Sequence, residues 1–242
     1  MTDIMIVIAV VAAGTVVQSS VGFGLAMMAG PFLIMIDPRY LPAPMLLAAL
    51  VLTIFMTFSY RREIRVRDIK PFVAGRIVGT LPGALLVGVL SATAFDILVG
   101  CCVLAAVGAS VIHRNLQATP KIVFVASIIS GFMSTTAAMG GPPMALAYQN
   151  MPRREMRGTL AMFFVAGCLI SLVGLALVGR LALADVGRAA WLLVGIVVGM
   201  LLAGPVIGLV DRGNAKPYIL ATSTLAGGYV LLRGLWELSH PL

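Results

Sequence analysis

The chain has 242 residues, of which 60% are hydrophobic and 11% are charged, and its formal net charge is +8. A soluble domain normally carries about 25% charged residues, so this chain lacks the polar side chains that cover a surface in water. The composition excludes a soluble protein and predicts a polytopic membrane protein.

The chain begins with a broken apolar segment and then repeats its own order of elements. Ile4 to Ile36 is interrupted at Gln18-Ser19-Ser20-Val21-Gly22-Phe23-Gly24 and continues to Pro31 and beyond. Three apolar stretches follow, each near the roughly 20 residues of a spanning helix: Ala43 to Ser59, Phe72 to Leu90 and Phe95 to Ile112. A second broken segment, Ile122 to Met151, is interrupted at Ser134-Thr135-Thr136-Ala137-Ala138-Met139-Gly140-Gly141-Pro142-Pro143. The last three stretches are Gly158 to Gly179, Ala189 to Val210 and Pro217 to Leu235.

Residues 1–116 and 117–242 therefore read as two four-segment repeats of one membrane domain, with no soluble domain. Three glycines support the repeat, because Gly75, Gly79 and Gly88 recur as Gly195, Gly199 and Gly208. The glycine pairs have the spacing that permits close helix crossing, and we predict a packing role for them.

The arms of the broken segments predict half-helices. Ile4 to Val17 and Leu25 to Ile36 are each too short to cross about 30 Å of hydrocarbon at 1.5 Å per residue. We predict two half-helices joined by a Gly/Ser turn near mid-depth, buried in protein or facing a water-filled cavity.

Loop charge distinguishes two topologies. If each broken segment crosses the membrane once, the chain has eight spans, with ten Lys and Arg on one side and six on the other. If each segment dips in and returns, twelve of the 17 share one face, four lie on the other, and Arg76 lies inside a span. Cytoplasmic loops are enriched in Lys and Arg, so the second topology is favoured. It predicts an all-α membrane protein of two inverted repeats, each a re-entrant helical hairpin plus three transmembrane helices, with both termini outside.

Interrupted hydrophobic segments at matching places in a repeat point to a transporter's substrate site. Hydroxyl and amide groups, and the free N–H groups at the start of a half-helix, suit an anion. Two such helix starts meeting from opposite faces would form an anion cage; the alternative is that the small residues only pack helices. The candidate substrate-binding residues are Gln18, Ser19, Ser20, Gly22, Phe23, Gly24, Arg76, Ser134, Thr135, Thr136, Gly140 and Gly141.

Arg76 is a basic residue near the start of the apolar stretch Phe72 to Leu90, and its repeat counterpart is the apolar Ile196. Intramembrane arginine is costly and suggests function. No Asp or Glu lies inside a stretch to neutralise it, since Asp96 and Asp211 sit at the ends of stretches, so a mobile anion is one candidate partner. The other interpretation is that Arg76, close to the interface, extends to the lipid headgroups.

Other classes of function are weaker. The positive-inside bias explains the basic loops, so we expect no nucleic acid partner. Cys101, Cys102 and Cys168 lie in apolar stretches with no metal-binding or disulfide spacing, and no cofactor or metal is expected. No catalytic motif supports an intramembrane enzyme, and without intramembrane Asp, Glu or His a proton pump is disfavoured. An anion channel of the same architecture stays open, as does a homo-oligomer; membrane lipids are expected contacts.

The two interruptions carry a family resemblance. Ser20-Val21-Gly22-Phe23-Gly24 with Pro31, and Gly131 through Gly140-Gly141-Pro142-Pro143, resemble the TauE/SafE family of sulfite exporters, also called the toluenesulfonate uptake permease family. The length and the two-fold repeat fit along the whole chain. The resemblance implies a multi-pass carrier in the plasma (inner) membrane that moves sulfite, sulfonates or related organic anions by alternating access. It does not fix the direction of transport.

Overall fold

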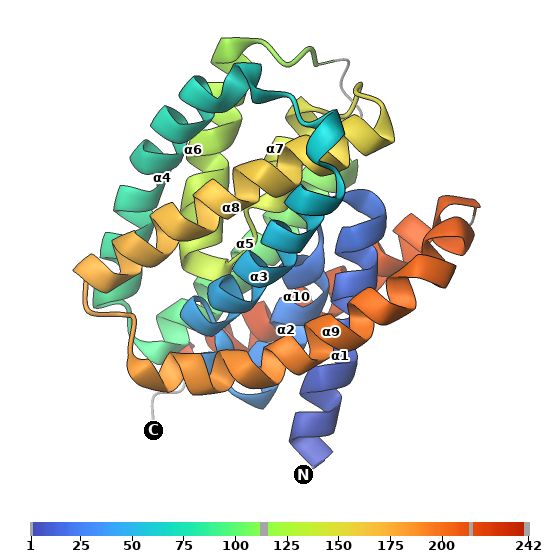
Figure 1. Cartoon of the computed structure of the whole chain (residues 1–242). Coiled ribbons are helices and arrows are strands. Elements are labelled where there is room, and N and C mark those ends of the chain that lie inside the picture. Colours follow the sequence, from blue (N-terminus) through green and yellow to red (C-terminus); the bar gives the residue numbers. More distant parts are fainter. Residues whose placement is uncertain (1, 112–115, 213–214, 240–242) are drawn as a thin grey trace.

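The chain folds into helices throughout the parts that the structure describes, which are residues 2–111, 116–212 and 215–239, with side chains described outside 205–219. In this part the computed structural model has ten α-helices (Figure 1). They are α1 (Thr2–Val21), α2 (Leu25–Ile36), α3 (Ala43–Ser59), α4 (Ile69–Val89), α5 (Ala92–Val111), α6 (Pro120–Ala137), α7 (Gly141–Ala147), α8 (Arg153–Leu177), α9 (Leu183–Arg212) and α10 (Ala215–Ser239).

All six clean apolar stretches form helices, which confirms that part of the prediction. The bounds of α3 are those predicted, and α4, α5, α8, α9 and α10 begin a few residues earlier. The predicted end of the third stretch, Ile112, lies outside the described residues. Seven helices of the described chain are long and apolar enough to cross a membrane: α1, α3, α4, α5, α6, α8 and α9. The chain is an all-helical membrane protein.

The first broken segment is a hairpin. A Cβ on Gly14 of α1 would lie 2.8 Å from the backbone oxygen of Leu25, the first residue of α2. Eleven residues of straight helix would instead separate these positions by about 16 Å. Gly22 and Gly24 make the reversal possible, because their φ angles of 97° and 119° are accessible to glycine without a side-chain clash.

The second broken segment is also a hairpin. The Ser130 hydroxyl of α6 donates to the carbonyl oxygen of Gly140 at 2.6 Å, and the Ser127 hydroxyl lies 3.4 Å from the sulfur of Met144 in α7. Ala138 takes a left-handed φ of 59° and ends α6. Both broken segments therefore turn back on themselves, as the hairpin topology requires.

The helices α1 and α6 continue through the residues that were predicted to interrupt them, so the breaks in the backbone fall later in the chain. Gln18-Ser19-Ser20 form the end of α1, and Ser134-Thr135-Thr136 form the end of α6. The hydroxyls of Ser20 and Thr136 donate to carbonyl oxygens four residues earlier, so these side chains are satisfied within a helix. With 20 and 18 residues, α1 and α6 are long enough to cross a membrane. The prediction of short half-helices is thus wrong for the first arm of each hairpin, whereas α2 and α7 have only 12 and 7 residues.

The two halves of the chain exchange their packing partners. The first helix of each half packs on the third long helix of the other half, α1 on α9 and α6 on α4 (Figure 1). At one interface Gly75 and Gly79 lie against the carbonyl groups of Phe124 and Ile128; at the other, Gly195 and Gly199 lie against those of Ile8 and Ala12. Both pairs of helices run parallel, because the contacts advance together along each pair. The predicted packing role of the glycine pairs is confirmed.

The same exchange holds for other pairs of helices. α3 packs on α9 as α8 packs on α4, and α10 packs on α2 as α5 packs on α7. In addition, α3 packs on its counterpart α8, and α5 packs on its counterpart α10, so these two pairs also join the halves. The pattern of contacts is therefore nearly unchanged when α1–α5 are exchanged with α6–α10.

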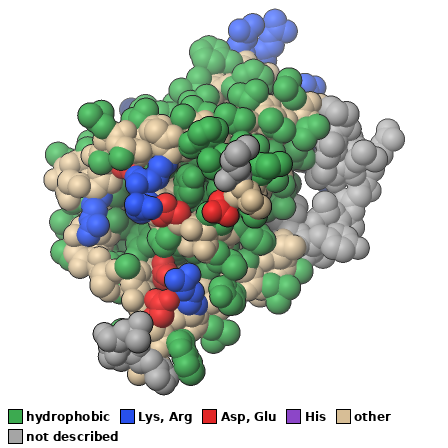
Figure 2. Space-filling model, turned by 90° about the horizontal axis from the view of Figure 1, so that it is seen from below, with side chains coloured by type: hydrophobic (Ala, Val, Ile, Leu, Met, Phe, Trp, Pro, Cys, Tyr) green, Lys and Arg blue, Asp and Glu red, His purple; other side chains and the backbone are tan. Residues whose placement is uncertain are grey.

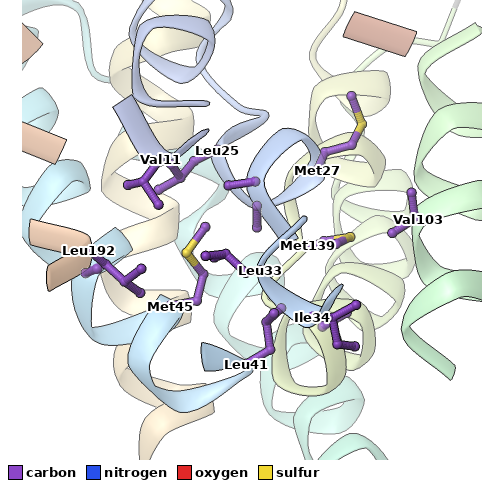
Figure 3. Packing of buried hydrophobic residues seen from close by; sticks show 14 of the residues in the cluster. Val11, Leu25, Met27, Leu33, Ile34, Leu41, Met45, Val103, Met139 and Leu192 are labelled. Carbon is purple, nitrogen blue, oxygen red and sulfur yellow. The ribbon is translucent and has the colours of Figure 1, made fainter. Parts of the chain in front are cut away.

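The apolar core surrounds the short arm α2. Figure 3 shows Leu33 and Ile34 of α2 among Val11, Met45 and Val103 from three different helices. The outer surface is apolar as well: Phe58, Leu85 and Leu201 are 68%, 63% and 76% exposed. Figure 2 shows a face covered mainly by hydrophobic side chains, with small groups of charged ones. Such a surface suits lipid on the outside, while the short arms are covered by protein.

The second hairpin is tied to the start of α4 by a buried hydrogen bond. The Tyr148 hydroxyl donates to Oδ2 of Asp68 at 3.0 Å, and the two residues are 1% and 2% exposed. The Tyr148→Phe variant removes this donor from a buried carboxylate, at a cost of about 1–3 kcal/mol of unfolding free energy. We expect a lower Tm in detergent. Tyr229→Phe, at a 53% exposed position, is the matched control; equal Tm values for both variants would contradict the prediction.

Candidate functional site

A small cavity of about 40 Å³ lies between the turns of the two hairpins. Residues of the helices α3, α4 and α8 form the rest of its lining. It has room for about three water molecules, since one needs roughly 10–15 Å³. The residues that line it are Gln18, Phe23, Gly24, Ala26, Met27, Leu46, Ala49, Thr53, Arg76, Ser134, Ala138, Met139, Gly140, Gly141, Pro142, Phe164 and Cys168.

Arg76 brings a buried positive charge to this cavity. Its side chain is 1% exposed, so the interpretation that it extends to the headgroups is wrong. α4 is flanked by α6 and α8, and these helices hold the guanidinium between them. Nη1 donates to the hydroxyl and the backbone oxygen of Ser130 at 2.7 and 3.0 Å, and Nη2 donates to the Ser171 hydroxyl at 3.3 Å.

The charge of Arg76 has no carboxylate partner in the described part of the chain. Its Nε is buried and donates no hydrogen bond. Two glycines leave room for the group: a Cβ on Gly140 would lie 2.8 Å from Nη1, and one on Gly167 would lie 2.8 Å from Cζ. The site thus combines an uncompensated cation with unused donor capacity.

The first turn contributes an amide and a helix start. The backbone N–H of Leu25 donates a hydrogen bond to Oε1 of Gln18 at 3.2 Å, so the oxygen of this side-chain amide faces the backbone of α2. Its NH₂ group is the part left to donate into the cavity. Ala26 and Met27 follow at the first turn of α2, before the bond from the N–H of Met28 to the oxygen of Gly24 begins the ladder. Their N–H groups carry the partial positive charge of a helix N-terminus.

The second turn does not mirror this arrangement. α7 has Pro142 and Pro143 in its first turn, and proline has no N–H. The symmetric anion cage expected from two helix starts is therefore wrong on the α7 side. Arg76 lies there instead, beside Gly140, and its repeat counterpart is the apolar Ile196.

Seven of the twelve sequence-predicted residues line the cavity: Gln18, Phe23, Gly24, Arg76, Ser134, Gly140 and Gly141. The other five lie elsewhere: Ser19, Ser20, Gly22, Thr135 and Thr136. Thr135 shares hydrogen bonds with Ser171 and Thr80, and therefore supports the group that holds Arg76. A Cβ on Gly22 would approach Arg157, and the Thr136 hydroxyl lies 3.6 Å from the sulfur of Cys102.

Sequence reasoning missed the residues that hold Arg76. Ser130, Ser171 and Gly167 belong to helices that are distant in the sequence. A buried guanidinium requires hydrogen-bond partners, so hydroxyl groups inside apolar stretches were the available signal. It could have pointed to Ser130, Ser171 and the lining residue Thr53, whereas no signal marked Gly167 or the lining residue Cys168.

The comparisons with known proteins agree with this architecture. The chain matches the family model "Sulfite exporter TauE/SafE" over residues 6–230, which includes the turns of both hairpins and every cavity residue. No curated protein and no solved structure matches it. The resemblance found in the two interruptions is confirmed, and the chain belongs to the TauE/SafE family of sulfite exporters.

Proposed function

We propose that the chain is a secondary transporter that moves small anions, such as sulfite or sulfonates, across the plasma membrane. The observation that carries the proposal is Arg76, a buried cation without a carboxylate partner that lines a cavity between two hairpin turns. Charged groups inside a membrane are retained for function, because an unpaired charge is costly there. An anion from solution neutralises that charge when it binds.

The bound anion would find donors from both hairpins and from α4. Arg76 supplies the charge, Gln18 its amide NH₂ group, and α2 the N–H groups of Ala26 and Met27. Phe23 and Phe164 form apolar walls that strengthen these interactions by excluding water. The twelve candidates thus divide into seven proposed contact residues and five with a supporting role.

Transport by alternating access requires two similar units that move against each other. We assign these units to residues 1–116 and 117–242, as inverted repeats. The exchange of packing partners between α1–α5 and α6–α10 supports the assignment. The basic loops that precede α4, α6, α8 and α10 would face the cytoplasm, where they also contact anionic lipids. Rocking of one unit on the other would open the cavity to each side in turn.

The test is counterflow of labelled sulfite in proteoliposomes that contain the purified chain. A carrier accelerates uptake of the label when unlabelled sulfite is present inside, and the rate saturates. A channel of the same architecture gives flux without counterflow stimulation. Vesicles that show no flux for sulfite or for a panel of sulfonates would overturn the proposal. The intramembrane enzyme has no observation in its favour.

Gly167 sets the space available to the proposed binding group. In the Gly167→Ala variant the added methyl group would lie 2.8 Å from Cζ and 2.9 Å from Nη2 of Arg76. The guanidinium can shift, so we expect little change in Tm but a roughly tenfold higher KM for the anion, or about 1.4 kcal/mol. Gly187→Ala is the control, because a Cβ there meets nothing within 4 Å. An unchanged KM would show that Arg76 takes no part in binding the anion.

A further inference from the structure

The cavity contains one charged side chain. Of its lining residues, all in the described part of the chain, only Arg76 is ionic. The nearest carboxylate along the chain is that of Asp68, which accepts the Tyr148 hydroxyl at the start of α4. The titratable group that lines the cavity with Arg76 is the Cys168 thiol of α8, while α6 presents Ser134 and α3 presents Thr53. The formal charge of the empty site is therefore +1.

The remaining donors are neutral and few. Besides the N–H groups of Ala26 and Met27, Gln18 offers one NH₂ group and Ser134 its hydroxyl. The Thr53 hydroxyl already donates to the carbonyl groups of Ala49 and Leu50. Ser130 and Ser171 are occupied by Arg76 itself. A second negative charge brought into this cavity would find no second cation, and burying an unpaired charge is strongly unfavourable.

We infer that the site selects monoanions: the protonated form of sulfite or a short alkyl sulfonate is carried, and a dianion such as sulfate is rejected. The inference rests on the proposed function and names its substrate class. A monoanion leaves the occupied cavity neutral, whereas a dianion leaves it at −1 in a low-dielectric interior.

The first experiment measures uptake of labelled methanesulfonate, a permanent monoanion, into proteoliposomes of the full chain. Unlabelled methanesulfonate and sulfate are compared as competitors at equal ionic strength. We expect sulfate to compete at least tenfold more weakly, a difference of about 1.4 kcal/mol. With labelled sulfite at fixed total concentration, uptake rises as the pH falls and the monoanion replaces the dianion. Methanesulfonate uptake over the same pH range is the control for titration of the protein.

A charge-adding variant provides the converse test. Gln18→Lys adds a second cation to the cavity and is expected to improve competition by sulfate at least tenfold relative to methanesulfonate. Gln117→Lys, at an exposed position, is the matched control and leaves the ratio unchanged. If Gln18→Lys does not fold, the competition of sulfate and methanesulfonate on the unchanged chain still tests the selectivity for monoanions.

The outcomes separate the two proposals. Equal competition by sulfate and methanesulfonate would overturn the monoanion selectivity and leave an anion carrier. Uptake of none of the anions above empty vesicles would overturn the carrier itself, and the selectivity with it.

Discussion

The Arg76→Met variant is expected to lose anion flux and to unfold at the same temperature as the unchanged protein or a higher one. Methionine keeps most of the volume and removes a buried charge that has no carboxylate partner. Replacing buried ionic groups with apolar side chains of similar volume is often neutral, or stabilising by about 1–4 kcal/mol. The hydroxyls that hold Arg76 keep other partners, because Ser130 donates to the oxygen of Gly140 and Ser171 pairs with Thr135.

The loss of flux follows from the attraction between the guanidinium and the anion. At about 4 Å and an effective dielectric constant near 20, this attraction is about 4 kcal/mol. Removing it weakens binding by about a thousandfold. Arg76→Lys keeps the charge and should retain part of the flux.

Counterflow of sulfite and thermal unfolding in detergent are the two measurements. Arg39→Met is the control, since Arg39 is exposed and pairs with Asp37 near the surface. Full flux in Arg76→Met would show that the anion binds elsewhere. A large fall in Tm would show that the guanidinium braces the three helices and has no need of an anion.

The Gly79→Ala variant is expected to fold poorly or not at all. A Cβ at Gly79 would overlap the carbonyl group of Ile128 and lie 2.9 Å from its Cα. These are backbone atoms, so no side-chain rotation relieves the overlap and α4 must move away from α6. Overpacking typically costs about 1–3 kcal/mol and sometimes more, and here the whole α4–α6 interface has to separate.

The measurements are the yield of monodisperse protein and its Tm. Gly199→Ala, the counterpart at the α1–α9 interface, should behave alike, because its Cβ would lie 2.5 Å from the oxygen of Ala12. Gly108→Ala is the control: an added Cβ meets nothing within 4 Å, and alanine is the better helix former by up to about 1 kcal/mol. Normal folding of Gly79→Ala would mean that the interface tolerates a wider separation.

Hydropathy predicted the six clean helices well, and it failed at the interruptions for a local reason. Ser and Thr are compatible with a helix when their hydroxyls bond to the preceding turn, as those of Ser20 and Thr136 do. In the two interruptions the backbone breaks where φ becomes positive, at Gly22 and Gly24 in the first and at Ala138 in the second. Composition therefore predicts the region of such a break more reliably than the residue at which the helix ends.

The site was predicted in part. Arg76 was found because a charge inside an apolar stretch is visible in the sequence, but its depth depends on its neighbours. The partners that bury it, Ser130 and Ser171, are 54 and 95 residues away. The asymmetry of the two turns, in contrast, is visible in the sequence, because Pro142 and Pro143 lack the N–H donors that a matching anion site would need.

The exchanged helix pairs have a consequence for how the chain is made. α1 is synthesised first, and its partner α9 only after most of the chain has entered the membrane. The glycine face of α4 likewise meets lipid until α6 arrives. We therefore expect the packing of the first half to be completed only after the second half has entered the membrane. Two half-chains produced separately would each expose an unfilled groove, and only their meeting in one bilayer would bring Arg76 to its partners.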